Sequence, residues 1–176
     1  MLLPQFFPMH WLNDGLDIAH IEIASDLGLD IVERDGSGTY QFLGMSNVRD
    51  SGEGFGNLLA QAISNLRSIQ AGRVMTAQCY GGAEGMTYSE TDNFGAARLT
   101  IESVRSIIAE ECGFDCWIGV PCRDIAYFWS SAQDDARRDE NEREVRSVYE
   151  KDDYNLSPNP ISFRRFTSLV NAALGA

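Results

Sequence analysis

The sequence predicts an α+β domain in which a largely antiparallel sheet packs against two or three helices. Hairpin signals recur along the chain, and two stretches carry the three- and four-residue apolar spacing of helices with one buried face. Strand-like and helix-like stretches are interspersed, without a linker, a repeat or a low-complexity segment between them. Because 176 residues is the size of one ordinary domain, we assign residues 1–176 to a single domain.

Composition and charge exclude several classes of protein. Hydrophobic residues make up 44% of the chain and charged residues 23%, as in a globular protein rather than a disordered one. The net charge of −12 repels phosphate, so we expect neither nucleic acid nor an anionic membrane surface as a partner. The acidity serves either solubility alone or an acidic face for a basic partner.

The chain begins with the apolar stretch MLLPQFFPMHW. Two prolines interrupt it and no basic region precedes it, so it lacks the pattern of a secretory signal. No apolar run approaches the ~20 residues of a membrane-spanning helix, and we therefore expect a cytoplasmic protein with reduced thiols. Residues 1–15 are expected to be an extended segment, and Phe6, Phe7 and Trp11 would anchor a partner if the domain does not bury them.

Strands are predicted in the first quarter of the chain. Ile18, Ile21 and Ile23 stand among polar residues, and the stretch LDIVERDGSGTYQFL follows them. In this stretch two β-rich runs flank residues 35–38, where two glycines supply the positive φ that a tight connection requires. We therefore predict a hairpin at this position.

Two helices follow from apolar periodicity. In residues 52–70 the apolar side chains recur three and four positions apart, and Gly72 is placed to end the helix. Residues 101–112 repeat the pattern, with Thr100 as the expected N-cap and Gly113 as the stop.

The second half of the chain predicts further antiparallel strands. RVMTAQCY (73–80) and GMTYSE (85–90) flank a Gly-Gly turn. Residues 116–120 form an apolar strand, and the proline-led sequence at 121–124 is typical of a type I turn. DIAYFWSS is then a returning strand, with a helix capped by the last residue of the turn as the alternative.

The C-terminal part combines a charged helix with a loop and an edge strand. Residues 132–153 are charged almost throughout, which is typical of a helix on the surface. LSPNPISFRRF then predicts a loop that leads to an edge strand, followed by a small helix. An exposed strand such as ISFRRF could pair across a homo-oligomer.

Three of the four cysteines fall within CGFDCWIGVPCRD (112–124). Their spacing lacks the paired C-x2-C knuckles of a zinc site, so we expect Cys112, Cys116 and Cys122 to be small core residues. A zinc site that also recruits Cys79 is the alternative. We expect no metal and no cofactor.

A catalytic thiol is a second alternative for this stretch. Cys122 precedes Arg123, a cation that could lower the pKa of the thiol. The bases available to it are His10 and His20, which lie far away in the sequence.

Two polar clusters stand at the boundaries of apolar elements. One is Asp92-Asn93 with Arg98, and the other is Arg123-Asp124. A guanidinium at such a boundary either pairs a carboxylate within the fold or presents its planar donors to a ligand. Asp92, Arg98, Arg123 and Asp124 are therefore the candidate binding residues, with structural ion pairing and turn capping as the alternative.

Several stretches, taken in order, carry a resemblance to a known family. They are Ala62–Arg67, Asp92–Leu99, the helix through Glu110, Cys116–Pro121 closing on Asp124, and Pro160–Phe163. Over about residues 40–165 they resemble the YtpQ-like family of bacterial proteins, a domain of unknown function. Members are usually longer, so the chain looks like the C-terminal portion of that family. The resemblance implies an α+β fold in the cytoplasm, and it supplies no catalytic residue and no metal-binding cysteine.

Together these observations favour a non-enzymatic binding or regulatory module that contacts a protein partner. The alternative is a small enzyme, with either an Asp/Arg polar site at the four candidate residues or a thiol site at Cys122.

Overall fold

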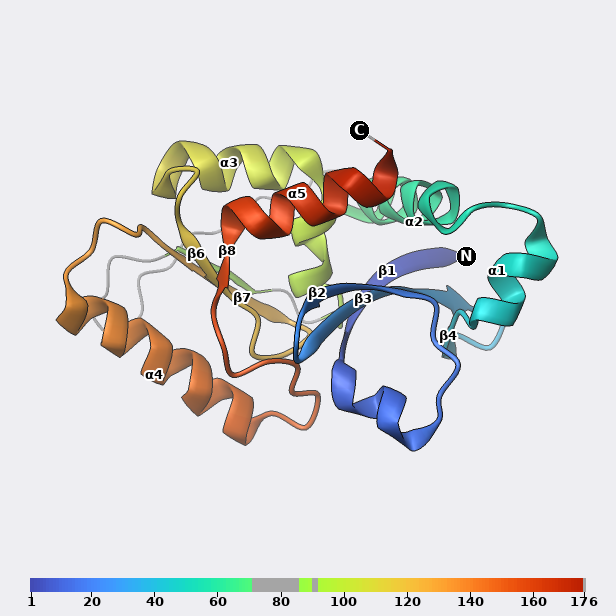
Figure 1. Cartoon of the computed structure of the whole chain (residues 1–176), viewed down its shortest axis with the longest axis horizontal. Coiled ribbons are helices and arrows are strands. Elements are labelled where there is room, and N and C mark those ends of the chain that lie inside the picture. The colour runs from blue at the N-terminus through green and yellow to red at the C-terminus, as the bar shows by residue number, and fades with distance from the viewer. Residues whose placement is uncertain (71–85, 90–91, 176) are drawn as a thin grey trace. The chain divides into compact units, whose positions relative to one another are not determined.

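The computed structural model of the chain describes residues 1–70, 86–89 and 92–175. The chain divides into two compact units, unit 1 (Met1–Arg73 with Ser168–Ala176) and unit 2 (Val74–Thr167). Both combine helices with antiparallel strands, which confirms the predicted α+β class (Figure 1). The assignment of all 176 residues to one domain stays a prediction.

The sheet of unit 1 is built around one central strand, β3 (Leu27–Arg34). One side of β3 pairs antiparallel with β1 (Leu2–Pro8). Its other side pairs first with β2 (His20–Ala24) and then with β4 (Tyr40–Phe42), also antiparallel (Figure 1). Because β3 has neighbours on both sides, its residues are buried from Leu27 to Val32.

The hairpin between β3 and β4 turns at residues 35–38, as predicted. The carboxylate of Asp35 accepts hydrogen bonds from the backbone N–H groups of Ser37 and Thr39, at 2.8 and 2.9 Å. Gly38 has a φ of 89°, a conformation that favours glycine. The prediction of positive φ is therefore confirmed at Gly38 but is wrong at Gly36, and the hydrogen bonds to Asp35 were not predicted.

The aromatic N-terminus is part of the core of unit 1. Phe6 and Phe7 expose no surface, because β1 pairs with the central strand along its whole length. The condition under which Phe6 and Phe7 would anchor a partner is therefore not met. Trp11 lies in a short 3-10 helix, η1 (Met9–Asp14), and its ring contacts the edge of Phe42 at a centroid distance of 5.6 Å.

Two helices cover part of unit 1. α2 (Phe55–Gln70) confirms the helix predicted from periodicity, and it packs against β1, where Asn65 Nδ2 donates to the Leu2 carbonyl at 2.9 Å. α1 (Met45–Ser51) was not predicted. Gly72, the predicted stop of the longer helix, lies outside the described residues. The buried apolar face of α2 consists of Leu58, Leu59, Ala62 and Leu66.

The sheet of unit 2 has the strand order β5-β7-β6-β8, with antiparallel pairing throughout. β5 (Met86–Ser89) confirms part of the strand predicted at 85–90. β6 (Trp117–Gly119) and β7 (Ile125–Trp129) form the predicted hairpin, so the alternative of a helix starting at Asp124 is wrong. The strand predicted at 73–80 and the Gly-Gly turn after it lie outside the described residues.

The predicted C-terminal edge strand is shorter than expected. β8 covers only Ile161–Ser162, at the end of the sheet beside β6. The rest of ISFRRF begins α5 (Phe163–Leu174), which is the predicted C-terminal helix. Phe163 and Phe166 are buried, at the three-residue spacing of one helix face. Pairing across a homo-oligomer through this edge stays a prediction.

The second predicted helix is α3 (Glu102–Cys112), and Gly113 ends it with a φ of 83°. Its N-cap is Ile101, one residue later than predicted. Thr100 instead ends a 3-10 helix, η2 (Ala96–Thr100), inside which its hydroxyl donates a hydrogen bond.

The charged stretch forms α4 (Asp135–Lys151), as predicted. Asp134 caps it by accepting a hydrogen bond from the Arg137 N–H at 2.9 Å. Val145 is buried, and the methyl groups of its side chain pack against Gly119 in the sheet. In the part of the chain that the structure describes, no helix combines the length and the apolar character needed to cross a membrane.

Candidate functional site

Three segments of unit 2 meet at the turn between β6 and β7: residues 92–96, 121–124 and 152–157. We call them the turn site. Backbone hydrogen bonds join the middle segment to each of the other two, and an antiparallel bridge pairs Cys122 with Asn155. The structure brings the two predicted polar clusters together here. The candidate residues in or beside the turn site are Asp92, Arg98, Arg123 and Asp124.

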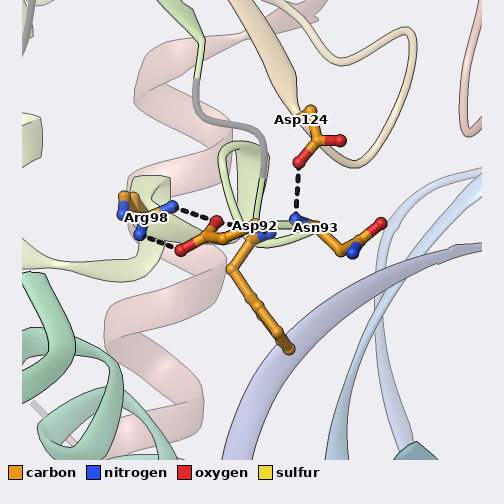
Figure 2. A network of polar contacts seen from close by, with 5 residues as sticks. Asp92, Asn93, Arg98 and Asp124 are labelled. Atoms are coloured by element: carbon orange, nitrogen blue, oxygen red, sulfur yellow. Dashed lines mark hydrogen bonds and ion pairs between the residues drawn. The ribbon is translucent and has the colours of Figure 1, made fainter.

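Asp92 and Arg98 form a buried bidentate ion pair. The two terminal guanidinium nitrogens of Arg98 donate to the two carboxylate oxygens of Asp92, at 2.8 and 2.5 Å (Figure 2). The Arg98 side chain has no exposed surface, whereas that of Asp92 is 28% exposed. Asp92 also accepts a hydrogen bond from the Phe94 N–H at 3.1 Å. This geometry corresponds to the structural alternative, since the planar donors of Arg98 face a carboxylate of the same loop.

Asp124 ties the turn to the neighbouring loop. Its Oδ1 accepts a hydrogen bond from the backbone N–H of Asn93 at 2.6 Å (Figure 2), and Asn93 has the left-handed φ of 67°. Burial raises the pKa of Asp124, the Asn93 hydrogen bond opposes this, and the negative charges of Asp92 and Asp152 raise it further. Arg123 acts in the opposite direction, so the carboxyl group is partly desolvated and lies between charges of both signs.

Arg123 points to the third segment. Its guanidinium carbon lies 4.8 Å from the centroid of the Tyr154 ring, which is cation–π distance. Burial lowers the pKa of Arg123, while Asp124 and Asp152 are among the groups that raise it. Tyr154 is 55% exposed as a residue, and its backbone N–H donates to Asp152 Oδ1 at 2.7 Å.

Tyr154 and Asp152 were not among the residues predicted from the sequence. The one available signal was an aromatic residue within the polar stretch KDDYNLSPNP, between the charged helix and the last strand.

The thiol of Cys122 does not have the predicted activated character. Its side chain is buried, and burial raises its pKa to about 11, with the negative charge of Asp152 adding to the shift. The prediction that Arg123 lowers this pKa is wrong, because the guanidinium lies against Tyr154 and the thiol is desolvated. Burial likewise raises the pKa of Cys116 to about 12.

The described residues of unit 2 offer these thiols neither a metal site nor a histidine base. Within the described ranges, no three His, Cys, Asp or Glu side chains are grouped so that they could hold a metal ion. Cys79 lies outside those ranges. Unit 2 contains no histidine, since His10 and His20 both belong to unit 1. Within unit 2, Cys122 therefore has no imidazole to deprotonate it.

Comparison of the chain with protein-family models, with curated proteins and with solved structures gives no match. The resemblance to the YtpQ-like family stays a prediction from the sequence.

Proposed function

We propose that this chain is a non-enzymatic binding module that contacts a basic protein partner through Tyr154 and the carboxylates around it. The observation that carries the proposal is the exposed Tyr154 ring, which is fixed in place at an acidic turn. Tyrosine is among the residues that contribute most to the energy of protein interfaces, provided that a partner can enclose it.

The segment that carries Tyr154 is preorganised for binding. The Arg123 guanidinium lies over one face of the ring, and the Leu156 N–H donates to the Pro121 carbonyl at 2.8 Å. Because the backbone on both sides of the tyrosine is already ordered, binding would cost little conformational entropy.

Charge indicates the kind of partner. Asp92 and Asp152 both raise the pKa of Asp124, and the cation Arg123 offsets part of this effect, so two carboxylates act on Asp124 in a partly desolvated place. A lysine or arginine of a partner would relieve this repulsion, and the net charge of −12 would speed its approach. An anionic ligand would meet the same repulsion and is disfavoured.

The enzyme alternative has less support. Asp92 and Arg98 direct their charges at each other, and the raised pKa of Cys122 leaves little thiolate near neutral pH. Neither feature is typical of an acid–base or nucleophilic site.

Affinity capture from an extract of the source cells tests the proposal. The wild-type chain should retain a basic protein, and raising the salt concentration should weaken its retention. Tyr154→Ala should abolish it. Asp152→Asn keeps the acceptor for the Tyr154 N–H but removes the charge, so it should reduce retention and its salt dependence.

Phe114→Ala is the matched control. Phe114 is also an exposed ring of unit 2, at 44%, and the Arg164 guanidinium lies 4.9 Å from its centroid. This variant should retain the partner as the wild type does. If the Tyr154 variant captures the same proteins as the wild type, the proposed surface is wrong.

A further inference from the structure

Asp30 lies in the middle of β3, the central strand of unit 1. It stands opposite Gln5 of β1 on one side and opposite His20 of β2 on the other. Directly opposed residues of antiparallel strands project to the same face of the sheet. Gln5, Asp30 and His20 therefore form a polar row across three strands, which we call the Asp30 row.

The Asp30 row is enclosed by apolar side chains. Side chains two positions apart on a strand share a face, so Gly28 and Val32 flank Asp30 on β3, and Leu3 and Phe7 flank the row on β1. Leu3, Phe7 and Val32 are all buried. The Phe7 ring occupies the space where a side chain at Gly28 would lie. The carboxyl group thus has hydrocarbon on either side along the strands.

Polar contacts offset little of the burial of this carboxyl group. Asp30 is fully buried, and among the described residues neither of its oxygens has a hydrogen-bond partner. Its neighbours in the row are turned toward the backbone. The Gln5 side-chain oxygen accepts from the Phe6 N–H at 3.0 Å, and His20 Nδ1 lies 2.8 Å from the Ile18 carbonyl.

Ionisation in such a place is strongly unfavourable, because a buried carboxylate loses its hydration and gains little interaction in return. Burial raises the pKa of Asp30 to about 8, and the nearby backbone groups of Ile31 and Leu43 offset only part of that rise. We propose that Asp30 is folded into the sheet as the neutral carboxylic acid, so that unit 1 takes up a proton from water when it folds.

The other charged groups around Asp30 in unit 1 are few. β1 carries no charged side chain. β2 contributes His20, which is half-buried, and Glu22, which is exposed. The only ionisable side chain of β4 is Tyr40 and that of α2 is Arg67, and both are exposed. His20 is therefore the one titratable group that faces Asp30 from within the row.

The consequence is a pH-sensitive sheet. In the unfolded chain Asp30 loses its proton near its ordinary pKa of 3.8, whereas in the folded sheet it keeps the proton up to about pH 8. Between these two pH values the folded state binds more protons than the unfolded state, so the free energy of unfolding of unit 1 falls as the pH rises. Below pH 3.8 and above about pH 8, Asp30 contributes no further pH dependence. Alkaline conditions would thus loosen the pairing of β1, β3 and β2.

A titration of the wild-type protein, labelled with ¹³C at the aspartate carboxyl carbons, tests the proposal directly. The Asp30 carbon should keep the chemical shift of a neutral acid at pH 6 and change to that of a carboxylate near pH 8. If it changes below pH 5, the proposal is overturned. This measurement requires no substitution, so it decides the matter even if variants at this position fail to fold.

Hydrogen exchange of the β1 and β3 amides provides the second test. After correction for intrinsic exchange, protection in the wild type should fall about tenfold per pH unit between pH 5 and 7, since one proton is released on opening. Asp30→Asn, which cannot ionise, should remove this dependence. Glu33→Gln, which changes an exposed carboxyl of the same strand, should keep it. A wild-type pH dependence that persists in the Asp30 variant would also overturn the proposal.

Discussion

Arg98 of η2 donates two parallel hydrogen bonds to the carboxylate of Asp92, and of these two side chains only that of Asp92 reaches the surface. The pair is separated by six residues, so it closes the loop that contains Asn93 and Gly95. With the loop closed, the Asn93 N–H faces Asp124 and the Gly95 backbone lies against the turn. This ion pair therefore positions one side of the turn site.

Asp92→Asn should strongly destabilise unit 2. The substitution removes the carboxylate charge that faces the buried guanidinium of Arg98, and loss of one partner of a buried ion pair typically costs about 3–5 kcal/mol of the free energy of unfolding. Urea unfolding at neutral pH measures the loss. The double variant Asp92→Asn with Arg98→Met should recover much of it, because the buried charge is then also gone.

The exposed pair between Asp115 and Arg164 is the control. Its oxygen and nitrogen lie 2.8 Å apart, but the two side chains are 72% and 58% exposed. Asp115→Asn should cost less than about 1 kcal/mol, because water screens the pair and solvates either partner alone. Equal losses of unfolding free energy in the Asp92 and Asp115 variants would mean that the Asp92–Arg98 pair stabilises unit 2 no more than the exposed pair does.

Gly95→Ala should also destabilise the turn site. The φ of Gly95 is −52°, which alanine adopts readily, so backbone strain is not the reason. A methyl group at this position would instead overlap the carbonyl oxygen of Asp124. Overpacking of this kind typically costs about 1–3 kcal/mol, and urea unfolding should detect it.

Gly54→Ala serves as the control for that substitution. A methyl group at Gly54 would meet no atom of the described part of the chain within 4 Å. The variant should be as stable as the wild type or slightly more stable, because alanine restricts the unfolded chain. If Gly95→Ala behaves in the same way, the loop and the turn are less closely packed than the structure indicates.

Elements with local signals could be predicted from the sequence, and an element that depends on distant residues could not. The hairpin at 35–38 and the helix at 55–70 carry their own turn residues and apolar spacing. The N-cap of α1 is Gly44, which has no side chain, and Asn47 Oδ1 accepts a hydrogen bond only from the N–H of Gly44 itself. The first N–H groups of α1, at Met45 and Ser46, are instead satisfied by the carboxylate of Asp17, 28 and 29 residues earlier. No local pattern reports such a contact.

The candidate site shows the same limit. The sequence identified Asp92 and Asp124 in two separate clusters, but not the hydrogen bond across 31 residues that connects Asp124 to Asn93. Tyr154 was missed because backbone hydrogen bonds, which leave no side-chain pattern, place its segment beside the turn. Asp30 was missed because a polar residue in a strand normally faces water, whereas both faces of β3 are buried here.

The three cysteines of CGFDCWIGVPCRD should differ in their reaction with iodoacetamide. With a pKa of about 11, Cys122 is ionised to about one part in a thousand at pH 8, and Cys116 is ionised less still. Cys112 is only half-buried, so it should react first in the native protein. Peptide mapping after timed alkylation gives the three rates separately.

Urea and pH distinguish burial from other causes of low reactivity. In urea all three thiols should react at similar rates, because the desolvation that raises each pKa is then lost. In the native protein the rate at Cys122 should rise about tenfold per pH unit up to about pH 11, since only the thiolate reacts. Rapid native labelling of Cys122 at pH 7 would contradict this account and would restore the thiol-enzyme hypothesis. Slow labelling supports a role for these cysteines as small apolar side chains in the core of unit 2.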